Sequence, residues 1–293
     1  MKKILLVIVL FSFSFYTIAQ SEDGRLKFSA ISINFGSVTN SNNYTGSLSD
    51  FQTLAPNSEL LKNPINNSNA KGYYYDYDFG AMFNVNAYFD ILNKNGEKSK
   101  FNTTLRFGIT FTDQVYFSQN SYSSESFRID TLTSSRDGNT FFVDSVQNEN
   151  YFMDYGSDQL LFDVAYIIGS NPESRLSIYG GLGISLGFSF NASTEISFSK
   201  DNNFVSGATN TYNSNTLNDF EYKEEIFSNR GGFSAMLSVP FGLEFRLSKR
   251  DNGWGNSRLF IEGRTGVTYL DIPELESRLI TSAMWGCGFK YNF

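Results

Sequence analysis

The chain contains no histidine and only one cysteine, Cys287, and these two shortages exclude several kinds of site. Without histidine no Ser-His-Asp triad can form, and no imidazole is available as a general base near neutral pH. A single cysteine cannot form an internal disulfide, and a zinc centre of cysteine and histidine ligands is equally excluded. A carboxylate pair such as Glu244 and Glu262 could in principle work without histidine, but arginines in the same segments favour a structural role. We therefore expect no enzyme, no cofactor and no metal site.

Charged residues and prolines are also scarce, at 18% of the chain and 5 residues, whereas aromatic residues reach 17% and glycine 24 residues. This composition favours β-strands over helices. The mean hydropathy of -0.26 argues against a bundle of membrane-spanning helices, but it is compatible with strands that are apolar on one face. The net charge is -7 and no basic stripe is present, so we expect no nucleic-acid partner.

The amino-terminal segment 1–19 has the pattern of a secretory signal peptide. Two lysines precede a mainly apolar run over residues 4–18, which is short for a membrane-spanning helix. Ala19 supplies the small residue expected at a cleavage site, so we predict a cut between Ala19 and Gln20. Residues 20–293 would then form a single exported domain, and a retained membrane anchor is the alternative.

Apolar and polar residues alternate over stretches longer than a strand of a soluble protein usually is. Between Tyr73 and Phe89 the odd positions carry Tyr, Phe, Ala and Val, while Asp, Asn and Gly recur at the even ones. A period of two residues indicates a strand with one apolar face. The pattern predicts about eight strands, over residues 26–36, 73–89, 101–111, 159–169, 176–190, 233–247, 258–269 and 279–293. In the first of them the parity slips at Ala30-Ile31, which indicates a β-bulge.

The connections between these strands differ in length in a regular way. Short turns are expected at 92–99, 170–174 and 249–256, and the other connections are 37–72, 113–158, 199–230 and 270–278. Short turns on one side and long loops on the other are typical of a transmembrane antiparallel up-and-down β-barrel, with the short turns in the periplasm. The strands must close into a ring, because hydrocarbon cannot hydrogen-bond a free strand edge. We also expect residues 114–130 and 140–156 to form a raised hairpin outside.

The last six residues, Gly288-Phe289-Lys290-Tyr291-Asn292-Phe293, resemble the C-terminal assembly signal of bacterial outer-membrane barrels. In that signal a glycine is followed by aromatic residues at the third and fifth later positions, which Gly288, Tyr291 and Phe293 match, whereas Gly286 stands where a polar residue is usual. With the signal peptide and the repeated strands, nearly all of the mature chain resembles the small barrels of the outer membrane protein A and X type. The resemblance implies localisation in the outer membrane of a Gram-negative cell and insertion by the barrel-assembly machinery.

The rival architecture is a secreted soluble barrel or sandwich, whose strands also alternate. Its apolar faces would point inward and its polar faces would point to water. The membrane interpretation instead predicts that Phe83, Leu237 and Phe241 face lipid.

The polar faces of the predicted strands carry charges that would fall inside the barrel. A charge in a narrow interior must be paired, because desolvation makes an isolated ion unfavourable. The predicted interior charge network comprises Arg106, Asp163, Glu244, Arg246, Glu262, Arg264 and Lys290. Within one hairpin we expect Glu244 opposite Arg264 and Arg246 opposite Glu262, since like charges directly opposite are unfavourable.

Two functions remain open from the sequence. The leading one is a structural or surface-interaction barrel whose long outer loops 37–72, 113–158 and 199–230 contact lipopolysaccharide, membrane lipid, envelope proteins or an external ligand. The alternative is a passive channel for ions or small solutes, although about eight strands leave an interior filled by side chains. Acidic loop residues, including Asp219 and Glu221, indicate a solvated outer face rather than a calcium site.

Overall fold

The computed structural model describes nine segments of the chain. They are residues 26–40, 46–62, 79–92, 102–113, 117–133, 135–171, 173–206, 220–248 and 254–293. The predicted signal peptide 1–19 and its cleavage site lie outside these segments, as do the first six residues of the predicted strand 73–89 and most of the turn 92–99.

Within the described segments, ten strands and one short helix are present. The elements are β1 (Leu26–Asn40), α2 (Leu48–Leu54), β2 (Phe79–Ile91), β3 (Asn102–Thr112), β4 (Phe117–Thr133), β5 (Thr140–Gly169), β6 (Leu176–Ser206), β7 (Glu221–Ser228), β8 (Phe233–Arg246), β9 (Ser257–Asp271) and β10 (Arg278–Asn292). Among the described residues no helix is long and apolar enough to cross a membrane.

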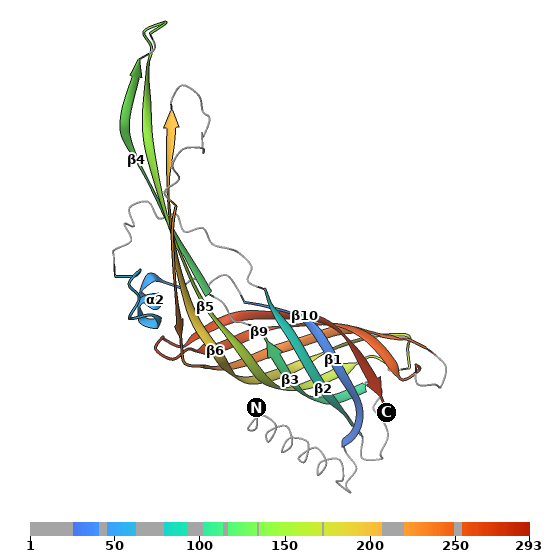
Figure 1. Cartoon of the computed structure of the whole chain (residues 1–293). Coiled ribbons are helices and arrows are strands. Elements are labelled where there is room, and N and C mark those ends of the chain that lie inside the picture. The colour runs from blue at the N-terminus through green and yellow to red at the C-terminus, as the bar shows by residue number, and fades with distance from the viewer. Residues whose placement is uncertain are drawn as a thin grey trace.

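Eight of the strands close into an antiparallel ring (Figure 1). The order around the ring is β1, β2, β3, β5, β6, β8, β9 and β10, and β10 pairs with β1 to complete it. Every pairing in the ring is antiparallel. The predicted eight-stranded up-and-down barrel is therefore confirmed. The predicted bulge also occurs, next to its expected position, because the β1–β2 register shifts between Phe28 and Ala30.

The barrel is apolar outside and polar inside. Many outward-facing apolar side chains of the ring strands, including Phe83, Leu237 and Phe241, are between 38% and 72% exposed, while Asn84, Thr110 and Ser185 are buried. The alternation along each strand produces this division, since neighbouring side chains point to opposite faces. The outward orientation is the opposite of that required by a soluble barrel with an apolar interior.

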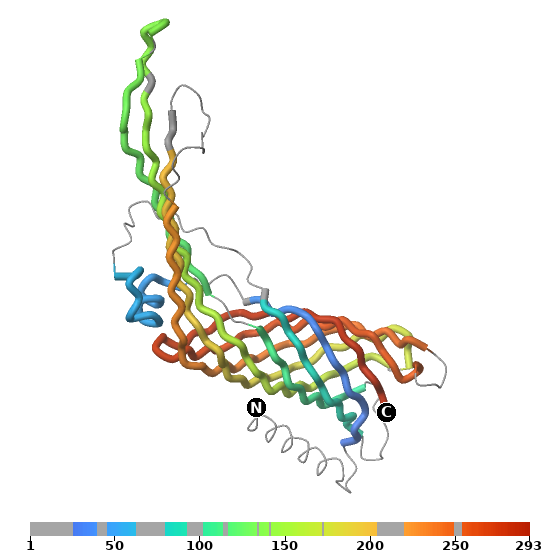
Figure 2. The backbone as a smooth tube through the Cα atoms, viewed as in Figure 1, coloured from blue at the N-terminus to red at the C-terminus, as the bar shows by residue number. Residues whose placement is uncertain are grey.

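Two of the ring strands continue far beyond the barrel (Figure 2). β5 has 30 residues and β6 has 31, so each extends for about 100 Å. Above the ring, β4 pairs with β5 and β7 pairs with β6, and the four strands form what we call the raised sheet, in the order β4-β5-β6-β7. The predicted hairpin of 114–130 with 140–156 is thus found. The prediction of loops at 113–158 and 199–230 is wrong for most of their described residues, which belong to strands.

The helix α2 covers the end of the barrel from which the raised sheet extends. Phe51 and Leu54 of α2 are buried in one apolar cluster with Phe117 of the raised sheet and with Leu270 and Ile280 of the ring. The capping box formed by Ser47 and Asp50 explains why a helix begins here. The helix lies within the connection 37–72, which the sequence predicted only as a long loop.

Closure of the ring requires a glycine at position 36 of β1. A Cβ atom at Gly36 would lie 1.8 Å from the carbonyl oxygen of Trp285 in β10. We expect Gly36→Ala to separate β1 from β10 and to destabilise the barrel by about 3 kcal/mol or more. The measurement is the folded fraction, from heat-modifiable migration of the refolded protein on a gel. Gly180→Ala is the matched control, because its Cβ would have its nearest neighbour at 3.8 Å; equal folded fractions for both variants would contradict the closure.

Candidate functional site

The barrel interior is filled by inward-facing side chains in successive layers. Along β2 these are Met82, Asn84, Asn86, Tyr88 and Asp90, from the raised-sheet end to the opposite end, which we call the short-turn end. All five are at most 4% exposed. Because strand residues alternate between faces, one strand contributes to every layer of the interior.

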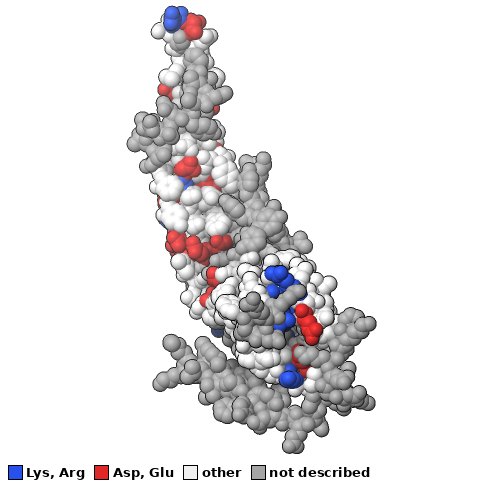
Figure 3. Space-filling view, turned by 90° about the vertical axis from the view of Figure 1, so that its right-hand side faces the viewer, with Lys and Arg blue, Asp and Glu red and all other residues white. Residues whose placement is uncertain are grey.

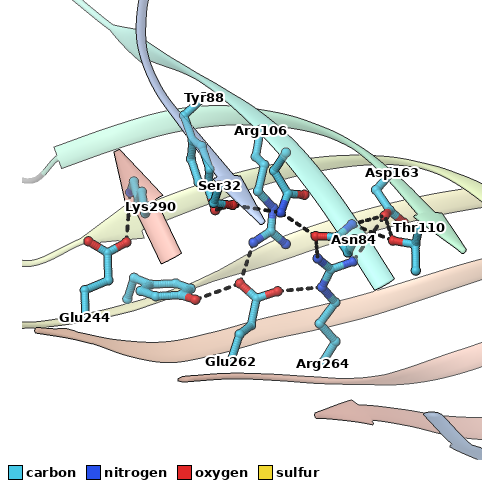
Figure 4. A network of polar contacts seen from close by, with 12 residues as sticks. Ser32, Asn84, Tyr88, Arg106, Thr110, Asp163, Glu244, Glu262, Arg264 and Lys290 are labelled. Carbon is cyan, nitrogen blue, oxygen red and sulfur yellow. Dashed lines mark hydrogen bonds and ion pairs between the residues drawn. The ribbon is translucent and has the colours of Figure 1, made fainter. Parts of the chain in front are cut away.

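A central cluster joins four charged residues from three ring strands (Figure 4). The carboxylate of Glu262 in β9 accepts hydrogen bonds from Arg106 of β3, from Arg264 Nε at 2.6 Å and from Tyr179 Oη at 2.7 Å. Arg264 Nη1 also contacts Asp163 Oδ2 of β5 at 3.2 Å. The side chains of the four charged residues are at most 5% exposed.

The central cluster is electrically balanced and well supplied with neutral donors. Two arginines face two carboxylates, so no net charge remains in it. Asp163 additionally accepts hydrogen bonds from Thr110, Ser185 and Asn84, of which the last is 3.2 Å long. Buried ions are tolerated when their remaining hydrogen-bonding capacity is satisfied in this way.

A second cluster lies nearer the short-turn end. Glu244 of β8 accepts from Lys290 Nζ of β10 at 2.8 Å and from Arg258 Nη1 of β9 at 3.1 Å. Tyr88 connects the two clusters, because Lys290 Nζ lies 4.2 Å from the centre of its ring and Arg106 lies over the same ring at 6.0 Å. Two cations share one carboxylate here, so this cluster is not balanced by its own members.

The predicted register of the β8–β9 hairpin is wrong. Glu244 lies opposite Phe260 and not Arg264, and Arg246 lies opposite Arg258 and not Glu262. The physical reason is that the partners of these charges come from across the interior. Arg264, for example, contacts Asp163, which is 101 residues away in the sequence. Pairing within one hairpin could not reveal such contacts.

Arg258 takes the interior position that was predicted for Arg246. Arg246 lies at the short-turn end, where its Nε donates to the carbonyl of Gly255 at 2.7 Å, and it is only partly buried. Arg258 was not among the predicted interior charges, yet it is 7% exposed and bonds to Glu244. Arg258 occupies an even position of β9, as Glu262 and Arg264 do, so the alternation along this strand could have identified it as an interior residue.

The three residues of the C-terminal signal lie at the end of the chain, where it pairs with β1. A Cβ at Gly288 would lie 2.2 Å from the carbonyl oxygen of Ile33, so β1 approaches closely there. The rings of Tyr291 and Phe293 are in contact at 5.2 Å, and Phe293 is 67% exposed. The backbone N–H of Phe293 donates to the carbonyl of Ser29.

Two small cavities lie between the interior layers of the described chain. One of 30 Å³ lies beside Glu244, Arg258 and Lys290, and one of 20 Å³ lies beside Met236 and Met284. The apolar cluster of Val38, Met82, Leu161, Met236 and Met284 separates the charged clusters from α2. Around these two cavities the inward side chains are buried, as expected for the filled interior of an eight-stranded barrel.

The helix α2 is fixed over the ring by polar contacts. Arg278 of β10 bonds to Asp50 at 3.2 Å, and Asn229 donates to the carbonyl of Leu54 at 2.8 Å. Burial alone would raise the pKa of the Asp50 carboxyl, but hydrogen bonds from Ser47 and the charge of Arg278 outweigh it and hold that pKa below its ordinary value. Asp50 is therefore charged at neutral pH and keeps its bond to Arg278.

The acidic residues of β7 have protein partners. Glu221 pairs with Lys223 at 2.6 Å, Glu224 accepts from the Tyr222 hydroxyl at 3.1 Å, and Glu225 accepts from Ser58 at 2.5 Å. Asp219 lies outside the described residues. Over the described ranges no group of three or more His, Cys, Asp or Glu side chains could hold a metal ion.

Removal of the central carboxylate should be strongly destabilising. We expect Glu262→Gln to lower the free energy of unfolding by about 3 to 5 kcal/mol, because it leaves two buried arginines with one carboxylate. Adding Arg106→Met should recover more than half of that loss, since the charges balance again. The measurement is unfolding by denaturant in detergent micelles, followed by tryptophan fluorescence.

The matched control for this experiment is Arg128→Gln, which breaks the exposed Arg128–Asp144 pair and should cost less than about 1 kcal/mol. A loss of similar size for Glu262→Gln and Arg128→Gln would contradict a stabilising interior network.

Comparison with known proteins gives similarity to solved barrels only. No protein-family model matches the chain, and no curated protein matches it. Among solved structures, Neisserial surface protein A is 11% identical, with a TM-score of 0.36 over 91% of this chain and 97% of that one. Ail, the attachment invasion locus protein of Yersinia pestis, solved with the heparin analogue sucrose octasulfate, is 12% identical, with a TM-score of 0.25 over 90% and 99%. The assignment of this chain as an eight-stranded antiparallel barrel rests on its own hydrogen-bonded ring.

Proposed function

We propose that the chain is an integral outer-membrane barrel that presents the raised sheet as an interaction surface outside the cell. The observation that carries this proposal is the continuity of β5 and β6 from the apolar wall into the raised sheet. A tilted strand needs only about 9–11 residues to cross a bilayer. About twenty residues of each of these strands are therefore available beyond it.

The wall of the barrel fits hydrocarbon. Large outward apolar side chains on all eight ring strands would be costly in water, and contiguous apolar surface of this extent marks contact with a membrane or a partner. The ring pairs its backbone groups internally, as a membrane-spanning sheet must. In this setting the interior clusters fill the barrel and stabilise it.

The orientation of the barrel in the membrane follows from the difference between its two ends. Short turns and the C-terminus would lie in the periplasm, and α2 and the raised sheet would lie outside, beside lipopolysaccharide. Export would use the signal peptide 1–19, and the barrel-assembly machinery would read Gly288, Tyr291 and Phe293 during insertion.

The raised sheet has the charge of a surface that binds cationic groups. Its segments 117–158, 193–206 and 220–228 contain twelve acidic and four basic residues, which gives -8, compared with -7 for the whole chain. Figure 3 shows acidic residues distributed along the raised part of the molecule. On one face Asp154 lies opposite Glu195, so like charges are neighbours and would favour a positive partner.

We infer a basic protein or peptide as the partner class. The side chains of Phe220, Tyr222 and Ile226 are exposed in the edge segment 220–228 and would add apolar contact. An anionic ligand such as the heparin analogue bound by Ail would be repelled by this surface. The channel alternative gains no support from the interior cavities of 20 and 30 Å³, which are too small to conduct a solute.

The single cysteine offers a direct test of the lipid-facing wall. Cys287 is exposed on β10, opposite Phe35 and Ile261. In protein reconstituted into vesicles we expect no reaction of Cys287 with a charged, membrane-impermeant maleimide, because hydrocarbon excludes the reagent. The measurement is the labelled fraction by mass spectrometry.

The matched control is Ser126→Cys in a Cys287→Ser background, since Ser126 is exposed on the raised sheet. This variant should react quickly. Equal labelling rates at positions 126 and 287 would show that the wall is in water and would overturn the membrane assignment.

Binding to a cationic probe tests the interaction surface. We expect fluorescent oligolysine to bind the reconstituted protein in a salt-dependent manner, and Glu195→Gln with Glu224→Gln to weaken the affinity about tenfold, since exposed charges steer and hold a positive partner. Fluorescence anisotropy would measure the dissociation constants. Glu173→Gln, at the short-turn end, is the control and should leave the affinity unchanged; equal effects of the two changes would refute the raised sheet as the surface.

A further inference from the structure

β4 is an end strand of the raised sheet, and only one of its edges is paired. Among the described strands it pairs with β5 alone, from Phe117 opposite Tyr155 to Thr133 opposite Thr140. Figure 1 shows β4 as the outermost strand on that side of the raised sheet. Its second edge, which we call the outer edge, carries a row of backbone N–H and C=O groups that no described strand satisfies. Such a row is a template for a further strand.

The outer edge of β4 lacks the features by which end strands usually avoid pairing. Native end strands are commonly short or carry charges, lysine above all. β7, the end strand on the other side of the raised sheet, follows this rule, because it has 8 residues and four of them are charged, including Lys223. β4 has 17 residues, of which only Glu125, Arg128 and Asp130 are charged, and it contains neither lysine nor proline. Of the two end strands, β4 is therefore the one suited to accept a partner.

The accessible part of the outer edge runs from Ser118 to Arg128. Below it, Phe117 is buried against α2. Above it, the β4–β5 register shifts between Arg128 and Asp130, and a bulge there ends the regular ladder. The eleven residues between these limits extend for about 35 Å, which is long enough for a complete strand. Five of the eleven are serines, whose small side chains leave the backbone accessible.

Two polar side chains of β4 are directed away from the outer edge. The hydroxyls of Tyr122 and Ser124 both donate to Asn148 Oδ1 of β5, at 2.7 and 2.8 Å. Asn148 in turn donates to Asp201 Oδ2 of β6 at 3.2 Å, so these bonds run from β4 across β5 to β6. They hold β4 in its strand conformation before a partner binds, and a preorganised template lowers the cost of association.

The charge around this edge favours a positively charged partner. The segments 41–78, 113–158, 193–232 and 272–277, which connect the ring strands at the raised-sheet end, contain twenty acidic and seven basic residues, which gives -13. The count includes every residue of these segments. An extended segment rich in lysine or arginine is attracted by such a surface, and an acidic one is repelled.

We propose that the outer edge of β4 pairs with an extended, lysine- or arginine-rich segment of a partner protein, which becomes a fifth strand of the raised sheet. In strand addition of this kind the main chain supplies affinity and alternate side chains supply specificity. The inference rests on the function proposed above, and it names the contact by which the basic partner is held.

A second copy of this chain fits the outer edge less well than a basic segment does. β4 runs away from the ring in every copy, so two copies in one membrane could pair their β4 strands only in parallel, which is the less stable arrangement. Both copies would also bring the same acidic segments together. A dimer in detergent micelles, measured by sedimentation, that the peptide probe does not dissociate would show a second copy on this edge and would overturn the proposal.

Backbone methylation of a peptide probe tests strand addition on the unaltered protein. The probe is a fluorescent peptide of alternating lysine and threonine, as long as the outer edge, and its binding to the reconstituted protein is measured by fluorescence anisotropy. A strand at a sheet edge directs only alternate N–H groups to its neighbour. We expect N-methylation of one alternate set, all the lysines or all the threonines, to weaken binding about tenfold or more, because several backbone hydrogen bonds are lost together. Methylation of the other set should leave the affinity unchanged.

The two methylated peptides are matched controls for each other, because they have the same side chains and the same charge. Equal affinities of the two would show that side-chain charge alone holds the partner, which overturns strand addition and leaves the acidic interaction surface standing. Binding of oligolysine without binding of the unmethylated probe would have the same meaning. Failure of both oligolysine and the probe to bind would refute this inference together with the proposed function.

Crosslinking locates the added strand on the raised sheet. A photoreactive benzoylphenylalanine in the unmethylated probe should form crosslinks within residues 118–128, identified by mass spectrometry after proteolysis. Crosslinks confined to β7 would place the probe at the other end strand and would overturn the assignment to β4.

Discussion

The structure depends on one constraint, the closure of the hydrogen-bonded ring between β1 and β10. A sheet surrounded by hydrocarbon has no solvent to satisfy a free edge, so the first and last strands must meet. Glycines make that meeting possible, since the backbones at Gly36 and Gly288 leave no room for a Cβ atom. Once the ring is closed with eight strands, the interior is narrow, and every inward side chain must fit beside those of the other strands.

The narrow interior explains why its charges form clusters. Arg106, Asp163, Glu262 and Arg264 come from three different strands, and each would be unfavourable alone. Together with neutral donors they form a balanced core that replaces the apolar core of a soluble protein. The layer of apolar side chains above them and α2 beyond it continue this packing towards the raised sheet.

The two ends of the molecule differ in charge. The raised sheet is strongly acidic, whereas cations and carboxylates lie together around a pocket at the short-turn end. The acidity of the raised sheet is not needed for folding, because the ring and the central cluster are complete without it. It fits the positive partner proposed for that surface, which the rigid barrel holds in place.

The sequence by itself determined the eight strands, their sidedness and the raised hairpin, because alternation with a period of two is a local property of each strand. The order of the strands followed from turn lengths, which are also local. Only the tertiary structure decided the β8–β9 register, the role of Arg258 and the docking of α2. These depend on contacts between distant segments, such as Arg264 with Asp163 and Arg278 with Asp50, and no pattern within a single hairpin records which side chain will lie across a closed interior.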